Sequence, residues 1–311
     1  MIVLGTKLAT LFPNQSFLSY TSFLVSRPVA IVLTLANVCI GLVLSAFSVR
    51  SVAFISQQYL FERTPMEVLA LLFLLIVVYA VSGSRAGVFR LNVLFLPIIL
   101  ISFLFVGVMN IKWIETENLL PIFQTDVKDY IKGIGKTYEV FIGFGIVLFY
   151  TVIVKQPTNL VKKAVIGITI PIIFYIAVFL LSIGVFGNMV TENLNFPMIE
   201  LAKRIDIPGG ILERVDALVF TIWIMAIFNT VALALDVSVF LLTSIFKQID
   251  KRILTFTLSP IVYYMSMFPQ QEDQIKRLSS ISSQFIAYFT IALTVGLLMI
   301  AKIRGVKRAT K

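Results

Sequence analysis

Residues Pro28–Leu60 read PVAIVLTLANVCIGLVLSAFSVRSVAFISQQYL, a run in which apolar side chains greatly outnumber polar ones. A helix needs about 20 predominantly apolar residues to cross the hydrocarbon core of a bilayer, which is about 30 Å thick. The run exceeds that length, so it predicts a membrane-spanning helix that extends beyond the hydrocarbon core. The fold class then depends on how often such runs recur.

The chain has 311 residues, of which 59% are hydrophobic and 14% are charged. This composition is typical of integral membrane proteins. We predict an all-α polytopic membrane protein with about eight transmembrane helices in a single domain, residues 1–311, the shortest runs being read with their polar flanks. The seven further runs are Met66–Val81, Leu91–Met109, Val140–Val154, Ala164–Phe186, Glu213–Phe246, Ile253–Phe268 and Phe285–Ile303.

The lengths of these runs recur in order. A long, a short and an intermediate run begin at Pro28, and the same order begins again at Glu213, five spans later. This spacing predicts two inverted five-helix repeats, of which the first lacks one or two helices at its N-terminal end. Met1–Phe12 would then be the tail of a helix. Secondary transporters are often built from inverted repeats and bind substrate where the repeats meet.

The net charge of +10 could suggest a nucleic-acid-binding protein, but its distribution indicates membrane topology instead. If the N-terminus is cytoplasmic and the spans alternate, the cytoplasmic segments hold 15 Lys and Arg residues and a single acid, Asp250. An excess of Lys and Arg marks the cytoplasmic side. We therefore predict cytoplasmic termini, the lipid bilayer as a partner, and no nucleic acid.

Several kinds of chemistry are disfavoured by composition. The chain has no histidine, which excludes histidine-based catalysis and histidine metal ligands, and its one cysteine, Cys39, can form no intrachain disulfide. No nucleophile–base pair or metal-ligand cluster is evident. We expect no enzymatic activity, no cofactor, no metal site and no catalytic residues.

Glycines interrupt the short run Val140–Val154 at Gly143-Phe144-Gly145. Short or glycine-interrupted spans are the best sequence indication of a discontinuous helix whose free backbone groups bind a substrate. Such glycines can also serve close packing between helices. In the predicted repeat this run is the first helix of the second half, which favours the binding interpretation.

Polar residues within the other apolar runs supply further candidates. Asn37 and Asn229 lie in the two long runs, where an amide could bind a zwitterion or could simply hydrogen-bond between helices. Glu139 and Asp236 could hold a proton or a substrate ammonium group. Alternatively, Glu139 is exposed to water, and Asp236 lies near the cytoplasmic interface, where the cost of a membrane charge falls.

Outside the spans, Phe196–Ile207 has the period of an amphipathic helix. Met198, Leu201 and Ala202 share one face. Glu200 is spaced to pair with Lys203 and Arg204 on the other. We expect this segment to lie at the outer surface or against the helix bundle, as a connector or an interfacial helix.

Seven short motifs occur together along the chain, in an order that resembles the spore germination permease family from roughly Leu4 to Ile303. The family comprises the B subunits of GerA-type germinant receptors and is related to amino-acid/polyamine/organocation transporters. The motifs are Arg63-Thr64-Pro65, Leu96-Pro97-Ile98-Ile99, Asn118-Leu119-Leu120-Pro121, Gly184-Val185-Phe186-Gly187, Phe196-Pro197-x-x-Glu200-Leu201-Ala202, Glu213-Arg214-Val215-Asp216-Ala217-Leu218 and Ile222-Trp223-Ile224.

The resemblance implies a ten-helix fold, A- and C-type partner subunits in the inner spore membrane, and recognition of a small germinant, typically an amino acid. The ligand would bind near Asn37, Gly143–Gly145 and Asn229. Two alternatives are a proton-coupled secondary transporter of amino acids, using Glu139 or Asp236, and a truncated, weakly functional paralogue. The resemblance also implies that this sequence lacks the family's first helix and most or all of its second.

Overall fold

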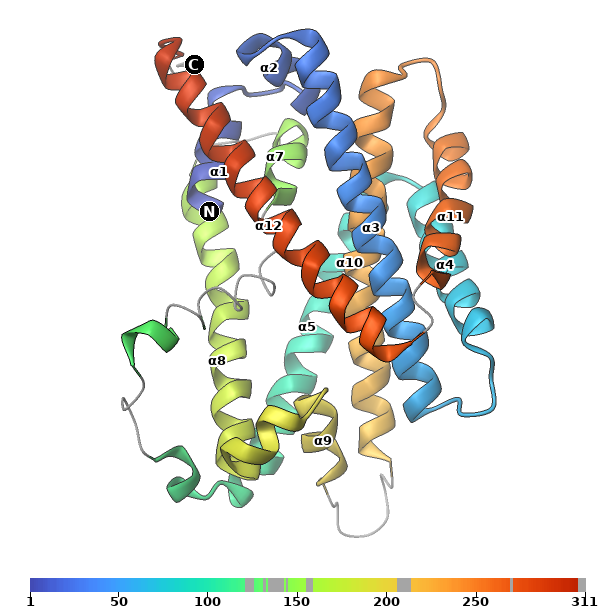
Figure 1. The fold of residues 1–311 in the computed structure, drawn as a ribbon, viewed down its shortest axis with the longest axis vertical. Coiled ribbons are helices and arrows are strands. Elements are labelled where there is room, and N and C mark those ends of the chain that lie inside the picture. Colours follow the sequence, from blue (N-terminus) through green and yellow to red (C-terminus); the bar gives the residue numbers. More distant parts are fainter. Residues whose placement is uncertain are drawn as a thin grey trace.

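The computed structural model describes residues 1–120, 126–130, 133, 143, 145–154, 159–205, 214–268 and 271–306. Within these ranges the chain is mostly helical and contains no β-strand (Figure 1). Five of the described helices are long and apolar enough to cross a membrane. The prediction of an all-α polytopic membrane protein is confirmed. The arrangement in two inverted repeats stays a prediction.

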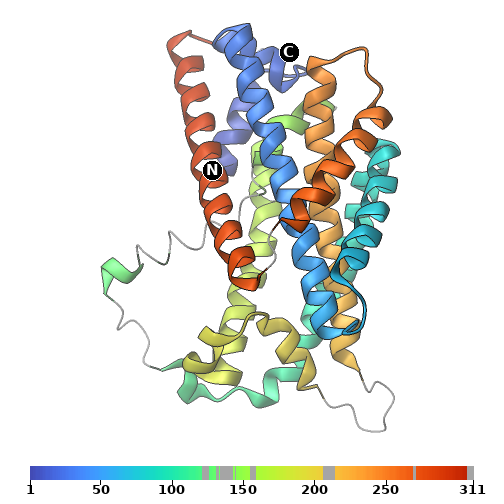
Figure 2. The ribbon, with the colours of Figure 1, turned by 45° about the vertical axis from the view of Figure 1, so that its right-hand side comes forward.

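Two long helices form the centre of the bundle, α3 (Arg27–Tyr59) and α10 (Val215–Ile245). They occupy the two longest apolar runs and lie side by side (Figures 1 and 2). Gly41 permits this close approach, because a Cβ atom on it would come within 2.9 Å of the Ala234 carbonyl oxygen. Ser238 Oγ donates a hydrogen bond across the contact to the Val38 carbonyl oxygen at 3.2 Å.

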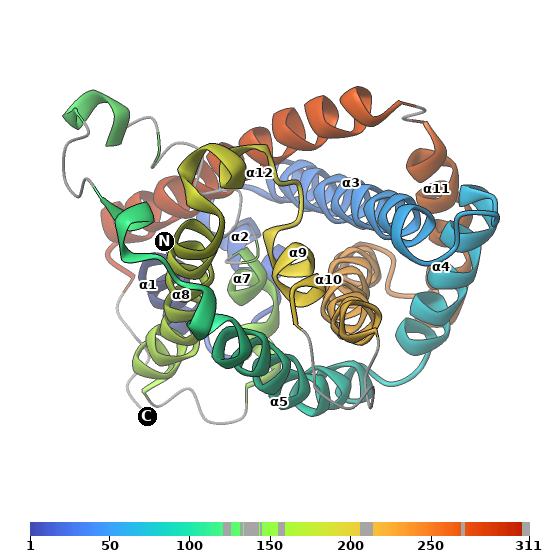
Figure 3. The ribbon, with the colours of Figure 1, turned by 90° about the horizontal axis from the view of Figure 1, so that it is seen from below.

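The other helices surround this pair, as the view along the bundle shows (Figure 3). On one side α4 packs against α3 and α11, while α5 packs against α10. On the other side α12 lies across α3, and α8 stands beside the N-terminal helix α1 (Figure 1). The bounds are Ile2–Leu11 (α1), Phe17–Leu24 (α2), Met66–Ser82 (α4), Arg85–Asn110 (α5), Leu160–Asn193 (α8), Lys251–Met267 (α11) and Glu272–Ile303 (α12).

One end of the bundle carries Arg27, Arg85, Lys251 and Arg304, and we call it the basic end. It holds the starts of α3, α5 and α11 and the finish of α12. Arg304 donates a hydrogen bond to the Phe23 carbonyl oxygen at 2.8 Å and so fixes the end of α12 to α2. The first residue of the chain lies partway along the bundle rather than at this end (Figure 1).

At the opposite end, a short helix packs against the bundle. This is α9 (Pro197–Lys203), whose Ile199, Leu201 and Ala202 are buried. Asn110 Nδ2 donates to the Leu201 carbonyl oxygen at 3.0 Å, which joins α9 to the end of α5. The predicted pairing within this helix is confirmed for Lys203, whose Nζ lies 2.9 Å from Glu200 Oε1.

The expected pairing of Glu200 with Arg204 does not form among the described contacts. Arg204 instead places its guanidinium over the rings of Trp113 and Phe186, 5.1 and 5.5 Å from their centroids. It also donates to the Val185 carbonyl oxygen at 3.5 Å. Arg204 therefore attaches α9 to the end of α8, where flat aromatic rings offer a guanidinium a stacking surface.

The interrupted run Val140–Val154 contains only a single α-helical turn in its described part, α7 (Val147–Tyr150). Gly143, Gly145 and Ile146 before it have 3-10 geometry, and the 3-10 turn η4 (Thr151–Ile153) follows it. Tyr20 on α2 donates a hydrogen bond to the Leu148 carbonyl oxygen at 3.2 Å, and burial raises the pKa of Tyr20, which keeps the donor protonated.

Candidate ligand-binding site

A cavity of about 260 Å³ lies where α3, α10 and α12 meet the interrupted segment. Each of these elements supplies several of its walls. Its volume is slightly below the range of about 300–1,000 Å³ typical of pockets for drug-sized ligands, which suits a smaller molecule. Its polar and backbone groups come from Asn37, Gly143, Gly145, Thr230 and Thr290. Its apolar walls include Ile40, Leu44, Phe149, Leu233, Val237 and Ile286.

Three polar side chains from three helices line this cavity. Asn37 on α3 is 6% exposed, and its Nδ2 donates to the Leu33 carbonyl oxygen at 2.7 Å. Thr230 on α10 donates to the Ala226 carbonyl oxygen at 3.3 Å, and Thr290 comes from α12. Each bond runs to the residue's own helix, so acceptor capacity remains for a ligand. No charged side chain lines the cavity among the described residues.

The glycines of the interrupted segment bring its backbone close to α12. A Cβ atom on Gly145 would lie 3.2 Å from Thr290 Cγ2, a tight contact. Gly143 has no such neighbour within 4 Å. Close approach of backbone to a neighbouring element is a common reason for glycine at a binding site.

The structure brings three of the predicted ligand residues together, because Asn37, Gly143 and Gly145 all line the cavity. Asn229 does not line it. Its Oδ1 is buried and accepts no hydrogen bond from the described residues. Phe144 and Glu139 lie outside the described residues.

Two polar lining residues, Thr230 and Thr290, were not predicted. A threonine in an apolar helix usually bonds to its own backbone, as Thr230 does, so sequence gives no sign of the side that it faces. Thr230 follows Asn229 directly on α10, and the two side chains point in different directions, so only Thr230 lines the cavity.

Asp236 lies near the cavity, in a polar cluster of its own. Its side chain is fully buried, and Oδ2 accepts hydrogen bonds from Tyr150 Oη at 2.6 Å and from Arg85 Nε at 2.8 Å. Lys251 Nζ lies 2.9 Å from Oδ1 as an ion pair, while its hydrogen bond goes to the Gly83 carbonyl oxygen at 3.0 Å. The Arg85 guanidinium also lies over the Phe240 ring, 4.1 Å from its centroid.

This cluster explains how a carboxylate is tolerated inside the bundle. A lone charge in a membrane helix is costly, whereas here two cations and a hydroxyl surround Asp236. The cations stand at the first positions of α5 and α11, at the basic end. The interpretation of Asp236 as a residue near the cytoplasmic interface stays a prediction. Its role as a proton or ammonium site also stays a prediction.

The cavity and the Asp236 cluster share two elements. On the interrupted segment, Phe149 lines the cavity and Tyr150 bonds Asp236. On α10, Ala234 and Val237 line the cavity on either side of Asp236 in the sequence. The walls of the cavity and the cluster are therefore adjacent along both elements.

Sequence reasoning also passed over Arg50, which is only 5% exposed on α3. Its Nη1 lies 3.8 Å from Met267 Sδ, and its Nε has no hydrogen-bond partner among the described residues. Glu67, in the first turn of α4, acts on it electrostatically. Arg50 lines none of the cavities described above.

A sequence model of the family described as "Spore germination protein" matches residues 1–275. The chain belongs to this family. This membership confirms the family resemblance that the short motifs indicated.

Relatives of this spore germination protein cover most of its length. It is 40% identical to spore germination protein GerLB of Bacillus cereus over 268 residues, 85% of this chain and 71% of that protein. It is 28% identical to spore germination protein YndE of Bacillus subtilis (strain 168) over 305 residues, 98% of this chain and 83% of that protein. Spore germination protein A2 of the same organism is 24% identical over 249 residues, 80% of this chain and 67% of that protein.

Several motif residues that carried the resemblance turn out to be structural. Asn118 Nδ2 donates to the Gly184 carbonyl oxygen at 3.1 Å, which joins two of the motifs. Gly187 has φ +74° within α8, a conformation that favours glycine. Arg214 Nη2 lies 3.3 Å from Asp216 Oδ2 at the start of α10. None of these five residues lines the cavity.

Proposed function

We propose that this spore germination protein is the B-type subunit of a germinant receptor and binds a small amino acid in the cavity between α3, α10, α12 and the interrupted segment. The observation that carries the proposal is that Asn37, Gly143 and Gly145 line a single cavity although they lie far apart in sequence. Family membership supports a role in spore germination.

The chemistry of the walls suits a small ligand with both a polar and an apolar part. Asn37, Thr230 and Thr290 supply hydroxyl and amide groups, and the 3-10 backbone at Gly143 and Gly145 forms a further part of the wall. Isoleucine, leucine and phenylalanine side chains cover the remaining wall. An α-amino acid with an apolar side chain combines these features.

Binding would act through the bond from Tyr150 to Asp236. A ligand seated against Phe149 on one side and Val237 on the other alters the spacing of the two elements that carry Tyr150 and Asp236. The ligand then favours whichever arrangement of the bundle accommodates it. This is the behaviour of a sensor, and it requires no substrate to cross the membrane.

The setting proposed for this subunit is the inner spore membrane, together with A- and C-type subunits. The basic end would face the cytoplasm, because Lys and Arg gather there. The names of the relatives, among them GerLB and A2, support membership in such a set of subunits.

A matched pair of asparagine variants tests the binding site. Asn37→Ala removes a group that lines the cavity, whereas Asn229→Ala removes an amide from the neighbouring long helix that does not. We expect the first to weaken amino-acid binding about ten-fold, as the loss of about one hydrogen bond to a charged ligand implies. The second should leave binding unchanged. Binding is measured by thermal shift of the purified chain in lipid nanodiscs across a panel of amino acids.

Equal effects of the two variants would contradict the cavity as the site. Absence of any amino-acid response in the unmodified chain would favour a weakly functional paralogue. Transport is separated from sensing by a second measurement. Uptake of labelled amino acids by proteoliposomes that hold only this chain would favour a secondary transporter, whereas loss of germination in a deletion strain without uptake would favour the receptor.

A further inference from the structure

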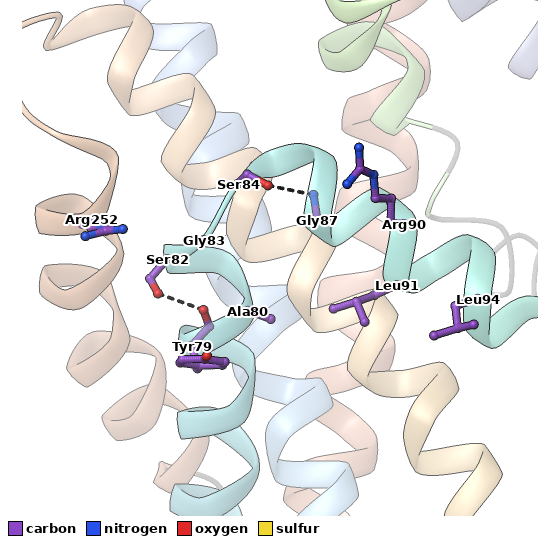
Figure 4. A pocket seen from close by; sticks show the side chains of 10 residues that line it. All are labelled: Tyr79, Ala80, Ser82, Gly83, Ser84, Gly87, Arg90, Leu91, Leu94 and Arg252. Carbon is purple, nitrogen blue, oxygen red and sulfur yellow. Dashed lines mark hydrogen bonds between the residues drawn. The ribbon is translucent and has the colours of Figure 1, made fainter.

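We propose that a hollow at the basic end of the bundle binds the phosphate headgroup of an anionic phospholipid. The hollow measures about 500 Å³ and lies where α4 turns into α5, beside the first turn of α11 (Figure 4). It is separate from the ligand cavity and shares no lining residue with it. Two arginines from different helices, Arg90 on α5 and Arg252 on α11, stand among its walls.

The charge of these arginines is not compensated within the described part of the chain. Around this hollow, four of the cations at this end occur in two pairs that are close in sequence, Arg85 with Arg90 and Lys251 with Arg252. The first member of each pair turns inward to Asp236. The second member of each pair lines the hollow and forms no ion pair with any described carboxylate. Asp236 thus satisfies two of the four cations and leaves two for a ligand.

The carboxylate nearest to Arg252 in sequence, that of Asp250, already accepts a hydrogen bond from the backbone. Asp250 Oδ1 accepts a hydrogen bond from the backbone nitrogen of Arg252 at 3.2 Å and so caps α11. Its side chain is not part of the hollow, and no Asp or Glu is found among the described lining residues. The hollow therefore carries positive charge with hydroxyl groups beside it, from Ser82 and Ser84.

The polar groups of the hollow lie near the turn between α4 and α5, and its apolar groups lie farther along the helices. A phospholipid likewise has a charged headgroup at one end and apolar acyl chains at the other. Figure 4 shows Arg252 and Arg90 on opposite sides of the Gly83–Ser84 turn. Tyr79, Leu91 and Leu94 lie farther along the helices from that turn. Tyr79 is 81% exposed and Leu94 is 59% exposed, which suits side chains that face acyl chains.

These features favour a phospholipid over a free anion. Arginine binds phosphate through a planar pair of donors. The Ser84 hydroxyl oxygen accepts from the Gly87 backbone nitrogen, so its proton is available to the phosphate, whereas Ser82 already donates to the Tyr79 carbonyl oxygen at 2.8 Å. Basic pockets between transmembrane helices bind the headgroups of anionic lipids. A free phosphate would use the arginines and leave the apolar walls uncovered, whereas a lipid covers both.

The experiment compares lipids and variants on the full chain. The thermal stability of the protein is measured in nanodiscs of phosphatidylcholine alone and of phosphatidylcholine with phosphatidylglycerol. The test variant is Arg90→Gln with Arg252→Gln. The control variant is Arg27→Gln with Lys247→Gln, which removes two exposed cations at the same end that do not line the hollow.

We expect phosphatidylglycerol to raise the melting temperature of the unmodified protein and of the control variant. The test variant should bind phosphatidylglycerol about five-fold more weakly for each arginine removed and should lose most of the shift. Its stability in phosphatidylcholine alone shows whether it still folds. If the test variant does not fold, the single variants Arg90→Gln and Arg252→Gln are used instead. Native mass spectrometry then counts the phosphatidylglycerol molecules that each variant retains, and we expect fewer than on the unmodified protein.

Two results would overturn the proposal. One is an equal loss of the shift in the test and control variants, which would mean that net charge alone attracts the lipid. The other is an equal stabilisation by inorganic phosphate added to phosphatidylcholine nanodiscs, which would assign the hollow to a free anion. Both results leave amino-acid binding in the separate cavity unaffected, so failure here is distinguishable from failure of the proposed receptor function.

Discussion

At the scale of single residues, Asp236 shows how one buried charge can organise its surroundings. It collects Arg85, Lys251 and Tyr150 from three different elements. Removing one member of a buried pair leaves the others unmatched, which costs more than a surface pair contributes. The cluster therefore determines much of the local stability at the basic end.

We expect Asp236→Asn to lower the free energy of unfolding by about 1–3 kcal/mol, because the two cations lose their counter-charge. The effect is limited by the side-chain exposure of Arg85 and Lys251, 23% and 20%. Asp216→Asn is the control, since the exposed Arg214 side chain makes its pair worth about 0–1 kcal/mol. Denaturant unfolding in detergent gives both values. Equal losses would contradict the central role of Asp236.

Residue chemistry also sets the limit of prediction from sequence. Asn37, Gly143 and Gly145 could be predicted as ligand residues because an amide or a glycine break is unusual in an apolar run. The partners of Asp236 could not, because Arg85 lies 151 positions away and reads as an ordinary topology-setting cation. Thr290 gave no signal at all, since its role depends on how α12 lies across α3.

At the scale of elements, two glycines determine how helices run and pack. Gly41 allows α3 and α10 to approach closely, and Gly187 lets the chain change direction within α8. Sequence predicted the apolar runs that became these helices, because length and hydrophobicity are local properties. It did not predict which glycine serves packing and which serves a bend, because both roles depend on neighbours distant in sequence.

Gly41→Ala should destabilise the bundle by about 1–3 kcal/mol, because the new methyl group would overlap Ser238 and the Ala234 carbonyl oxygen. Gly107→Ala on α5 is a matched control, since nothing lies within 4 Å of its added Cβ. Thermal unfolding of the two variants side by side measures the difference. Similar melting temperatures would show that α3 and α10 are less closely packed than described.

Gly187→Ala should cost about 1–3 kcal/mol for a different reason, namely its backbone conformation of φ +74° and ψ 168°, which is essentially restricted to glycine. Gly167→Ala in the same helix has open space and ordinary helical geometry, so a neutral or slightly stabilising effect is expected. Urea unfolding of both variants provides the comparison. A neutral Gly187→Ala would indicate that α8 continues without the bend.

At the scale of the whole molecule, the distribution of charge over the two ends implies an orientation. Arg27, Arg85, Lys251 and Arg304 gather at the basic end, where the hollow and the Asp236 cluster also lie. The ligand cavity opens among the central helices, and none of these four cations lines it. Composition alone was sufficient to predict a polytopic membrane protein, whereas the cavity required the assembled bundle.

Cysteine labelling tests this orientation in a Cys39→Ser background. We expect Gln248→Cys, at the basic end, to react with a membrane-impermeant maleimide only after cells are opened. Thr116→Cys, exposed near the opposite end, should react in intact cells. Cells expressing each variant are labelled before and after permeabilisation. Reversed accessibility would place the basic end outside and would contradict the charge rule for this chain.

The Asp236 cluster has a final consequence for how the protein is made. Ribosomes deliver α5 before α10 and α10 before α11, so Arg85 is already in place when Asp236 emerges, while Lys251 follows. A carboxylate in an inserting helix is costly without a partner. The nascent α10 can meet Arg85 at once, and the arrival of Lys251 then completes its counter-charge. The cluster thereby links successful insertion of α10 to helices synthesised both before and after it.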